Sequence, residues 1–138
     1  MDSQIYNTKV KKLTGNNYNE LYAKAKFIYN NIASKTKRRP YLRSKFFKKE
    51  KVSLDLFWVH LMDKNKDDRV RRLKQYNCGL DLIKKSFHSP IAKLNPNNHS
   101  EMLYRFIGLN GDHDIFYVQI KENIKSKEKS LMSTFPNH

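Results

Sequence analysis

The stretch that decides the fold is residues 101–136, EMLYRFIGLNGDHDIFYVQIKENIKSKEKSLMSTFP. Three segments in it, 102–109, 115–122 and 129–135, are rich in aromatic and β-branched residues and alternate with a period of two. The connections between them, NGDHD and NIKSKEK, are short enough for hairpins. The stretch therefore predicts an antiparallel β-meander.

The chain ahead of this stretch has the apolar spacing of helices. We expect helices over residues 18–33, over 53–62 with Ser53 as the N-cap, and over 67–86. Residues 88–100 have the composition of a loop. The sequence thus predicts one α+β domain over residues 1–138, with a flexible arm over 1–17, a helical part over 18–87 and the meander over 101–136.

Charge is the strongest functional signal of the chain. Lys and Arg total 28, Asp and Glu total 13, and the formal net charge is +15. Such an excess repels itself, and a polyanion relieves the repulsion while releasing its own counterions. The composition predicts RNA or another nucleic acid as the partner. The alternative is a soluble basic protein whose charge has no binding role. With no lipidation motif present, we expect no membrane partner.

Several classes of protein are disfavoured by what the sequence lacks. Cys78 is the single cysteine, so it forms no intrachain disulfide and is expected to be a reduced core residue. The first residues, MDSQIYNTKVKK, have no apolar core of a secretory signal, and no apolar run approaches ~18 residues. We therefore expect a cytoplasmic location.

Metal-dependent and nucleotide-dependent chemistry is also disfavoured. The five histidines are scattered, no HExxH or P-loop motif occurs, and the few acids lie mostly beside basic residues. We expect neither a metal nor a cofactor. Cleavage of RNA without a metal remains possible, because the 2′-hydroxyl can attack the adjacent phosphate when cations and proton-transfer groups surround it.

Basic residues concentrate in two places that could contact phosphates. The segment 35–51, KTKRRPYLRSKFFKKEK, holds nine Lys or Arg and one Glu, with aromatic residues that either stack on bases or anchor the segment on the core. The start of the third predicted helix is the other place, where the alternative is an ordinary solvated face. The candidate nucleic-acid-binding residues are Lys37, Arg38, Arg39, Arg43, Lys45, Lys48, Lys49, Arg69, Arg71 and Arg72.

Strand parity groups the polar residues of the meander. In the middle strand Phe116, Val118 and Ile120 point one way, towards a core, while Gln119 and Lys121 point the other way. An open face carrying Arg105, Gln119, Lys121 and one of Ser133 or Thr134 is one interpretation. A row of ordinary solvent-facing residues is the other, and spacing alone does not decide between them.

Residues 38–136 resemble a family of small proteins from mobile elements and phages. The stretches that carry the resemblance are RRPYLRSKFFKKEKVSLDLFWVHL, DRVRRLKQYNCGLDLIKKS, NPNNHSEMLYRFIGL, FYVQIKE and KSLMSTFP. That family is assigned to the barnase, EndoU, colicin and RelE-like nuclease fold. The resemblance implies helices packed on a small antiparallel sheet, and a metal-independent ribonuclease activity of the toxin type.

The resemblance also implies catalytic positions. They are Arg105 in YRF, Lys121 in QIKE, and Ser133 or Thr134 in MSTFP. Arg105 and Lys121 would hold the scissile phosphate. Tyr104 stands where relatives often have a histidine, and tyrosine is a weaker base at neutral pH. Proton transfer is therefore assigned to Tyr104, His88 or Glu122.

Two other functions remain open from the sequence. One is a non-catalytic RNA- or DNA-binding subunit of a mobile-element, phage or defence ribonucleoprotein. The other is a toxin-like protein that acts through a protein partner, such as an acidic antitoxin or the ribosome.

Overall fold

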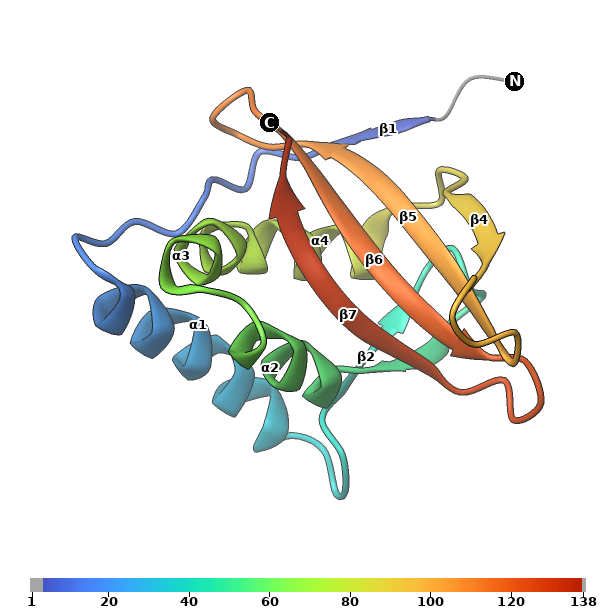
Figure 1. The fold of residues 1–138 in the computed structure, drawn as a ribbon. Helices are drawn as coiled ribbons and strands as arrows, with labels where there is room; N and C mark the ends of the chain where they lie inside the picture. The colour runs from blue at the N-terminus through green and yellow to red at the C-terminus, as the bar shows by residue number, and fades with distance from the viewer. Residues whose placement is uncertain (1–3, 138) are drawn as a thin grey trace.

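The long C-terminal strands form the centre of one sheet. In the computed structural model, which describes residues 4–137, strands β5 (Glu101–Leu109), β6 (Ile115–Asn123) and β7 (Lys129–Pro136) pair antiparallel in chain order. The predicted α+β class is confirmed. The three strands are not a small sheet by themselves, as the sequence predicted, but the centre of a curled, mixed sheet of seven strands (Figure 1).

Four short strands complete this sheet, and the sequence did not predict them. β1 (Ile5–Asn7) runs parallel to one end of β5, and β4 (Ile91–Leu94) runs antiparallel to the other end of the same edge. β2 (Tyr41–Ser44) and β3 (Glu50–Ser53) form a hairpin, in which β3 pairs parallel with β7. The predicted arm, the predicted loop and the basic segment therefore each contribute to the sheet.

The helices begin and end close to the predicted residues. α1 (Tyr18–Ala33) starts after Asn17, whose side chain accepts a hydrogen bond from the Glu20 amide. α2 (Asp55–Met62) follows. The predicted third helix is two helices, α3 (Lys66–Lys74) and α4 (Tyr76–Lys85). They separate at Gln75, whose φ and ψ of −92° and 0° depart from helical values.

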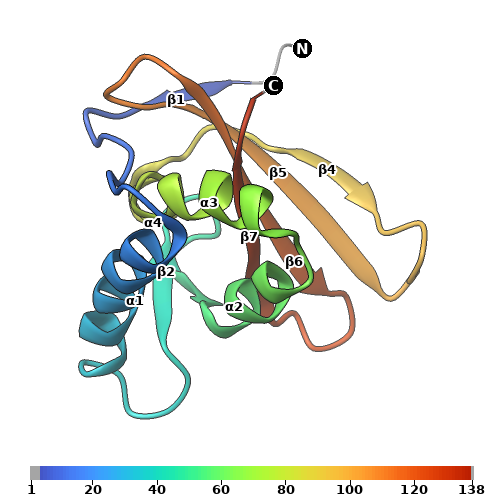
Figure 2. The same ribbon diagram turned by 60° about the vertical axis from the view of Figure 1, so that its left-hand side comes forward.

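The break at Gln75 lets the two helices pack on different partners. α3 packs on α1 and β7, whereas α4 lies in the curl of the sheet, with nearly all its apolar side chains buried (Figure 2). Gly79 brings α4 close to β7, because a Cβ atom there would lie 2.4 Å from Thr134 Cγ2. α2 and α3 lie beside β7 (Figure 2). This position brings His60 of α2 and Arg72 of α3 to the outer face of the sheet.

The core lies between the inner face of the sheet and buried side chains from all four helices. Phe116, Val118 and Ile120 are buried on that face, as strand parity predicts. The alternate residues of β6 therefore belong to the outer face, where the candidate site lies. Within residues 4–137 no helix is both long enough and apolar enough to cross a membrane.

Candidate active site

The outer face of the sheet carries a row of polar side chains across its three long strands. Arg105 on β5 lies opposite Gln119 on β6, and Gln119 lies opposite Ser133 on β7. A β-bulge between Gln119 and Ile120 leaves Met132 without a partner, since Ile120 pairs with Leu131. Bulges bend a strand and redirect its side chains. This one places Ser133 on the outer face next to α3.

Helices α2 and α3 complete a hollow above this row. Its volume is about 280 Å³, and we call it the cationic groove. Among residues 4–137 no carboxylate side chain lines it. The groove therefore collects positive charge and polar groups in one concave site, lined by His60, Lys64, Arg72, Arg105, Gln119, Met132, Ser133 and Phe135.

His60 is the titratable group of the groove with the most perturbed environment. It lies in the last turn of α2 and is half-buried. Burial lowers the pKa of His60 below its usual 6.5, and the charges of Lys121, Lys64 and Arg72 lower it further, against an opposing contribution from Asp63. The imidazole is therefore neutral at pH 7 and can accept a proton.

Arg72 is held in place on the opposite wall. Its Nε donates to Asp68 Oδ2 at 3.1 Å, its Nη1 donates to Ser133 Oγ, and its guanidinium lies 5.3 Å from the centre of the Phe135 ring. Burial alone would raise the pKa of Asp68, but hydrogen bonds from Arg72 and Arg71 lower it, so this carboxylate stays charged. The guanidinium is thus preorganised.

Arg105 lies over an aromatic pair on the floor of the groove. Tyr117 and Phe135 stack with centroids 5.3 Å apart and ring planes at 25°. The Arg105 guanidinium is 5.3 Å from the Phe135 ring and 5.9 Å from the Tyr117 ring, and it donates to Gln119 Oε1 at 3.2 Å. Arg105 is exposed. It can therefore contact a phosphate while the rings offer a stacking surface.

Lys121 shares the outer face but not the groove. It lies opposite Leu103, so it is a diagonal rather than a direct neighbour of Arg105. Its ammonium is 3.2 Å from Glu101. Lys121 lines an adjoining hollow of about 290 Å³, which holds two cations, Lys121 and Arg39, and three carboxylates, Asp55, Glu101 and Glu128. We call it the acidic hollow, and its negative balance disfavours a phosphate there.

Tyr104 and Glu122 lie on the other face of the sheet. The Tyr104 hydroxyl donates to Glu122 Oε1 at 2.7 Å, and Lys129 lies 3.0 Å from Glu122 and 2.8 Å from Glu50. Burial and the bond to Glu122 raise the pKa of Tyr104 to about 12. Burial alone would raise the pKa of Glu122, but bonds from Tyr104 and Lys129 hold it below its usual value. This pair cannot reach the phosphate that Arg105 would hold.

Thr134 and His88 also lie away from the groove. Thr134 is fully buried, and its hydroxyl donates to the carbonyl oxygen of Arg72 at 2.9 Å. Of the predicted pair, only Ser133 lines the groove. The His88 Nδ1 lies 3.0 Å from Gln4 Oε1 beyond the end of α4, and the ring stacks on Phe87.

The predicted phosphate-binding residues separate into distinct groups. Arg72 lines the groove, and Arg71 lines a further hollow. Arg69 has a structural role, because it donates to the carbonyl oxygens of Lys64 and Met62. The rest belong to the α1–β2 loop and the β2–β3 hairpin, where all seven are exposed: Lys37, Arg38, Arg39, Arg43, Lys45, Lys48 and Lys49.

Neither the cysteine nor a cluster of metal-ligating side chains offers a further reactive site within residues 4–137. Cys78 is buried, and burial raises the pKa of its thiol to about 12. Across the part of the chain that the structure describes, no group of three or more His, Cys, Asp or Glu side chains could hold a metal ion.

His60 is the functional residue that sequence reasoning missed. Its partners come from β5 and β7, which are remote in the chain. One local signal was available: His60 and Lys64 are only four residues apart, at the end of α2 and just beyond it.

Comparison of the chain with protein-family models, with curated proteins and with solved structures found no match. The assignment of a function therefore depends on the geometry of the cationic groove and on the chemistry of its side chains.

Proposed function

We propose that this protein is a metal-independent endoribonuclease whose active site is the cationic groove. The observation that carries the proposal is the position of His60. A neutral imidazole shares one hollow with Lys64, Arg72 and Arg105, and no carboxylate among residues 4–137 lines that hollow. A proton acceptor beside concentrated positive charge is what cleavage of RNA by its own 2′-hydroxyl requires.

The groove binds the scissile phosphodiester between its walls. Arg72 approaches from α3 and Arg105 from β5, so the phosphate oxygens meet a guanidinium on each side. Guanidinium groups match phosphate geometry with paired N–H donors. Asp68 and Ser133 hold Arg72, and Gln119 holds Arg105, which lowers the cost of ordering both side chains.

Cleavage is an internal transfer of the phosphoryl group. His60 takes the proton from the 2′-hydroxyl, the O2′–P bond forms, and the P–O5′ bond breaks. The Lys64 ammonium gives a proton to the departing 5′-oxygen. The products are a 2′,3′-cyclic phosphate and a 5′-hydroxyl, and both side chains recover their protonation states from water. The transition state carries extra negative charge, which Arg72 and Arg105 stabilise.

The resemblance to the RelE- and barnase-like nucleases supports the same proposal. Those proteins pack helices ahead of an antiparallel sheet, and here the helices also precede the three long strands. Of the positions that the resemblance implies, Arg105 and Ser133 line the groove, whereas Lys121 and Thr134 do not. The proton acceptor is His60 rather than Tyr104, Glu122 or His88.

The test is incubation of the purified protein with total RNA in EDTA, followed by mapping of the ends. We expect cleavage with cyclic phosphate and 5′-hydroxyl ends. DNA of matched sequence should stay intact, because it lacks the attacking 2′-hydroxyl. RNA that is bound and shifted but never cut would favour the second candidate, a non-catalytic binding protein that stacks bases on Tyr117 and Phe135.

Binding should weaken steeply as salt rises. The groove presents three cations, Lys64, Arg72 and Arg105, and the hollow that Arg71 lines adds Arg71 and Lys74. Arg71 and Arg72 share a single carboxylate, Asp68. Three to five phosphate contacts on a single strand correspond to a log–log slope of about −2 to −3.5. Fluorescence anisotropy with an uncleavable deoxyoligonucleotide between ~50 and ~200 mM salt measures the slope. A flat response would contradict an electrostatic interface.

A further inference from the structure

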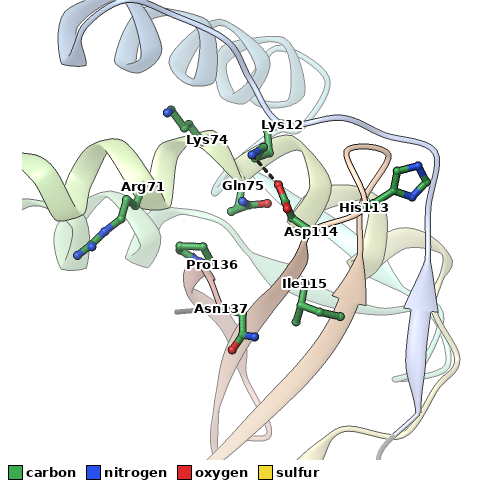
Figure 3. A pocket seen from close by; sticks show the side chains of 9 residues that line it. All are labelled: Lys12, Arg71, Lys74, Gln75, His113, Asp114, Ile115, Pro136 and Asn137. Atoms are coloured by element: carbon green, nitrogen blue, oxygen red, sulfur yellow. Dashed lines mark ion pairs between the residues drawn. The ribbon is translucent and has the colours of Figure 1, made fainter.

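A second and larger hollow lies at the C-terminal end of β7. Its volume is about 540 Å³, and the residues that matter here are Lys12, Arg71, Lys74, Gln75, Asp114 and Asn137 (Figure 3). They come from the N-terminal segment, from α3 and the residue after it, from the β5–β6 turn and from the end of β7. We call it the distal hollow.

The distal hollow adjoins the cationic groove on both walls. On α3, Arg71 lines the distal hollow and the next residue, Arg72, lines the groove. On β7, Pro136 lines the distal hollow and the preceding residue, Phe135, lines the groove. A chain bound in the groove can therefore continue into the distal hollow along the seam between α3 and β7.

Charge distinguishes the two possible exits from the groove. The distal hollow is lined by three cations, Lys12, Arg71 and Lys74, and by one carboxylate, Asp114. The acidic hollow at the other end of β7 is lined by two cations and three carboxylates. The balance is +2 at the first exit and −1 at the second, so a polyanion is attracted to one exit and repelled from the other.

Two of the cations in the distal hollow are available to a ligand. The Lys12 ammonium lies 2.6 Å from Asp114, and this pair is already neutralised. In Figure 3 the side chains of Arg71 and Lys74 extend away from that pair. Arg71 is exposed and its ion pair with Asp68 is 3.3 Å long, which leaves its other donors free for a phosphate.

The aromatic pair lies where the two hollows meet. Phe135 lines the groove, and the hydroxyl of its stacking partner Tyr117 donates to Asn137 Oδ1 of the distal hollow at 3.1 Å. A base can stack on these rings only when it is not stacked in a duplex. The rings therefore select single strands.

We infer that the substrate is an extended single strand of RNA, which runs from the cleavage site over Tyr117 and Phe135 into the distal hollow. Arg71 and Lys74 bind the phosphate that lies beyond the stacked base. The strand does not enter the acidic hollow. This inference rests on the proposed function, because it takes the cationic groove as the place where the chain is cut.

The experiment uses deoxyoligonucleotides with one ribonucleotide, which fixes the position of cleavage. A dinucleotide is compared with strands lengthened by three deoxynucleotides on the 5′ side or on the 3′ side. We expect extension on one side alone to raise kcat/KM by about tenfold or more, as additional phosphates are bound. Equal gains on both sides, or none, would overturn the inference while leaving the ribonuclease proposal intact.

The matched variants remove one charge at either end of β7. Arg71→Gln and Lys74→Gln should each reduce the gain from extension by about threefold to tenfold, whereas cleavage of the dinucleotide, which does not reach the distal hollow, should change much less. Lys125→Gln, in the turn between β6 and β7 at the other end, should change neither value. An equal loss in all three variants, or no loss in any, would refute the assignment of the distal hollow.

Binding of an uncleavable all-deoxy strand gives a readout that does not depend on catalysis. Arg71→Gln and Lys74→Gln should weaken binding of a single-stranded heptamer by about threefold to tenfold, and a duplex of the same sequence should bind less tightly than the single strand. If no RNA is ever cleaved, the proposed function fails. These affinities then decide separately whether the distal hollow holds a nucleic acid, and a duplex that binds as tightly would refute single-strand selection.

Discussion

The substitution His60→Ala should lower the rate of RNA cleavage by about a hundredfold to ten-thousandfold, the contribution that a positioned proton acceptor makes. Burial and the neighbouring cations keep the imidazole neutral, and alanine leaves the 2′-hydroxyl with water as its base. His60 is half-buried at the end of α2, so the loss of its side chain should leave the fold intact. Single-turnover cleavage of a defined RNA measures the effect.

The pH profile gives this prediction a signature that a structural role would lack. Burial and the neighbouring cations lower the pKa of His60 below its usual 6.5. The acidic decline in cleavage by the native protein should therefore have its midpoint below pH 6.5. In the His60→Ala variant the residual rate should lose this acidic limb.

The matched control is His88→Ala, which removes an imidazole that contacts Gln4 and Phe87 outside the groove. It should retain nearly full activity. A comparable loss in both variants, or a thermal unfolding midpoint that falls with activity in His60→Ala alone, would remove His60 from the active site.

The substitution Arg105→Ala should lower the cleavage rate by about a hundredfold to a thousandfold, because the transition state loses one preorganised cation. Binding of the uncleavable deoxyoligonucleotide should weaken much less, since the ground-state phosphate carries less charge than the transition state. Arg105→Lys should recover only part of the rate, because an ammonium cannot reproduce the flat contact of a guanidinium with Tyr117 and Phe135. Rates at saturating RNA and separate affinities give both quantities.

The control for Arg105 is Lys121→Ala on the same face of the sheet. The Lys121 ammonium is held by Glu101 and lines the acidic hollow, so its loss should change the rate by no more than a few fold. If Lys121→Ala were as damaging as Arg105→Ala, the scissile phosphate would lie across both hollows. The groove would then have been assigned incorrectly.

Local patterns in the sequence predicted the elements that local interactions determine. The helix over residues 18–33 was predicted with its observed bounds, because its spacing and its Asn17 cap are properties of neighbouring residues. The third helix was predicted as one element, since its apolar stripe continues through Gln75. The break there depends on tertiary contacts: Gln75 is buried, and its side chain accepts from Asn110 at 3.2 Å.

The short strands could not be predicted because their pairing partners are remote. β1 has three residues, and it is a strand only by its parallel ladder with β5. β4 is exposed along its whole length, so it lacks the alternation that marks a half-buried strand. In the basic segment the charges obscured a hairpin whose inner residues, such as Ser44 and Val52, are buried.

The candidate site was likewise predicted only where local patterns determine it. Parity and the resemblance gave Arg105, Lys121 and either Ser133 or Thr134, and of these Arg105 and Ser133 line the groove. Parity also separated Tyr104 from Arg105, since consecutive strand residues face opposite ways, but the sequence could not show which face was open. His60 and Arg72 join the site only because α2 and α3 lie beside β7, and no spacing within either helix contains that information.

The bulge at Met132 has a consequence for how chains of this kind can differ in length. A strand normally tolerates no change of a single residue, because every later side chain would exchange its solvent side for the core. At Met132 the two-for-one pairing removes this restriction. A chain without Met132 would still pair Ser133 with Gln119 and Thr134 with Val118, and would lose the local bend and one side chain from the lining of the groove. Deletion of this one residue would therefore leave the two faces of β7 unchanged and alter only the approach of Ser133 to Arg72.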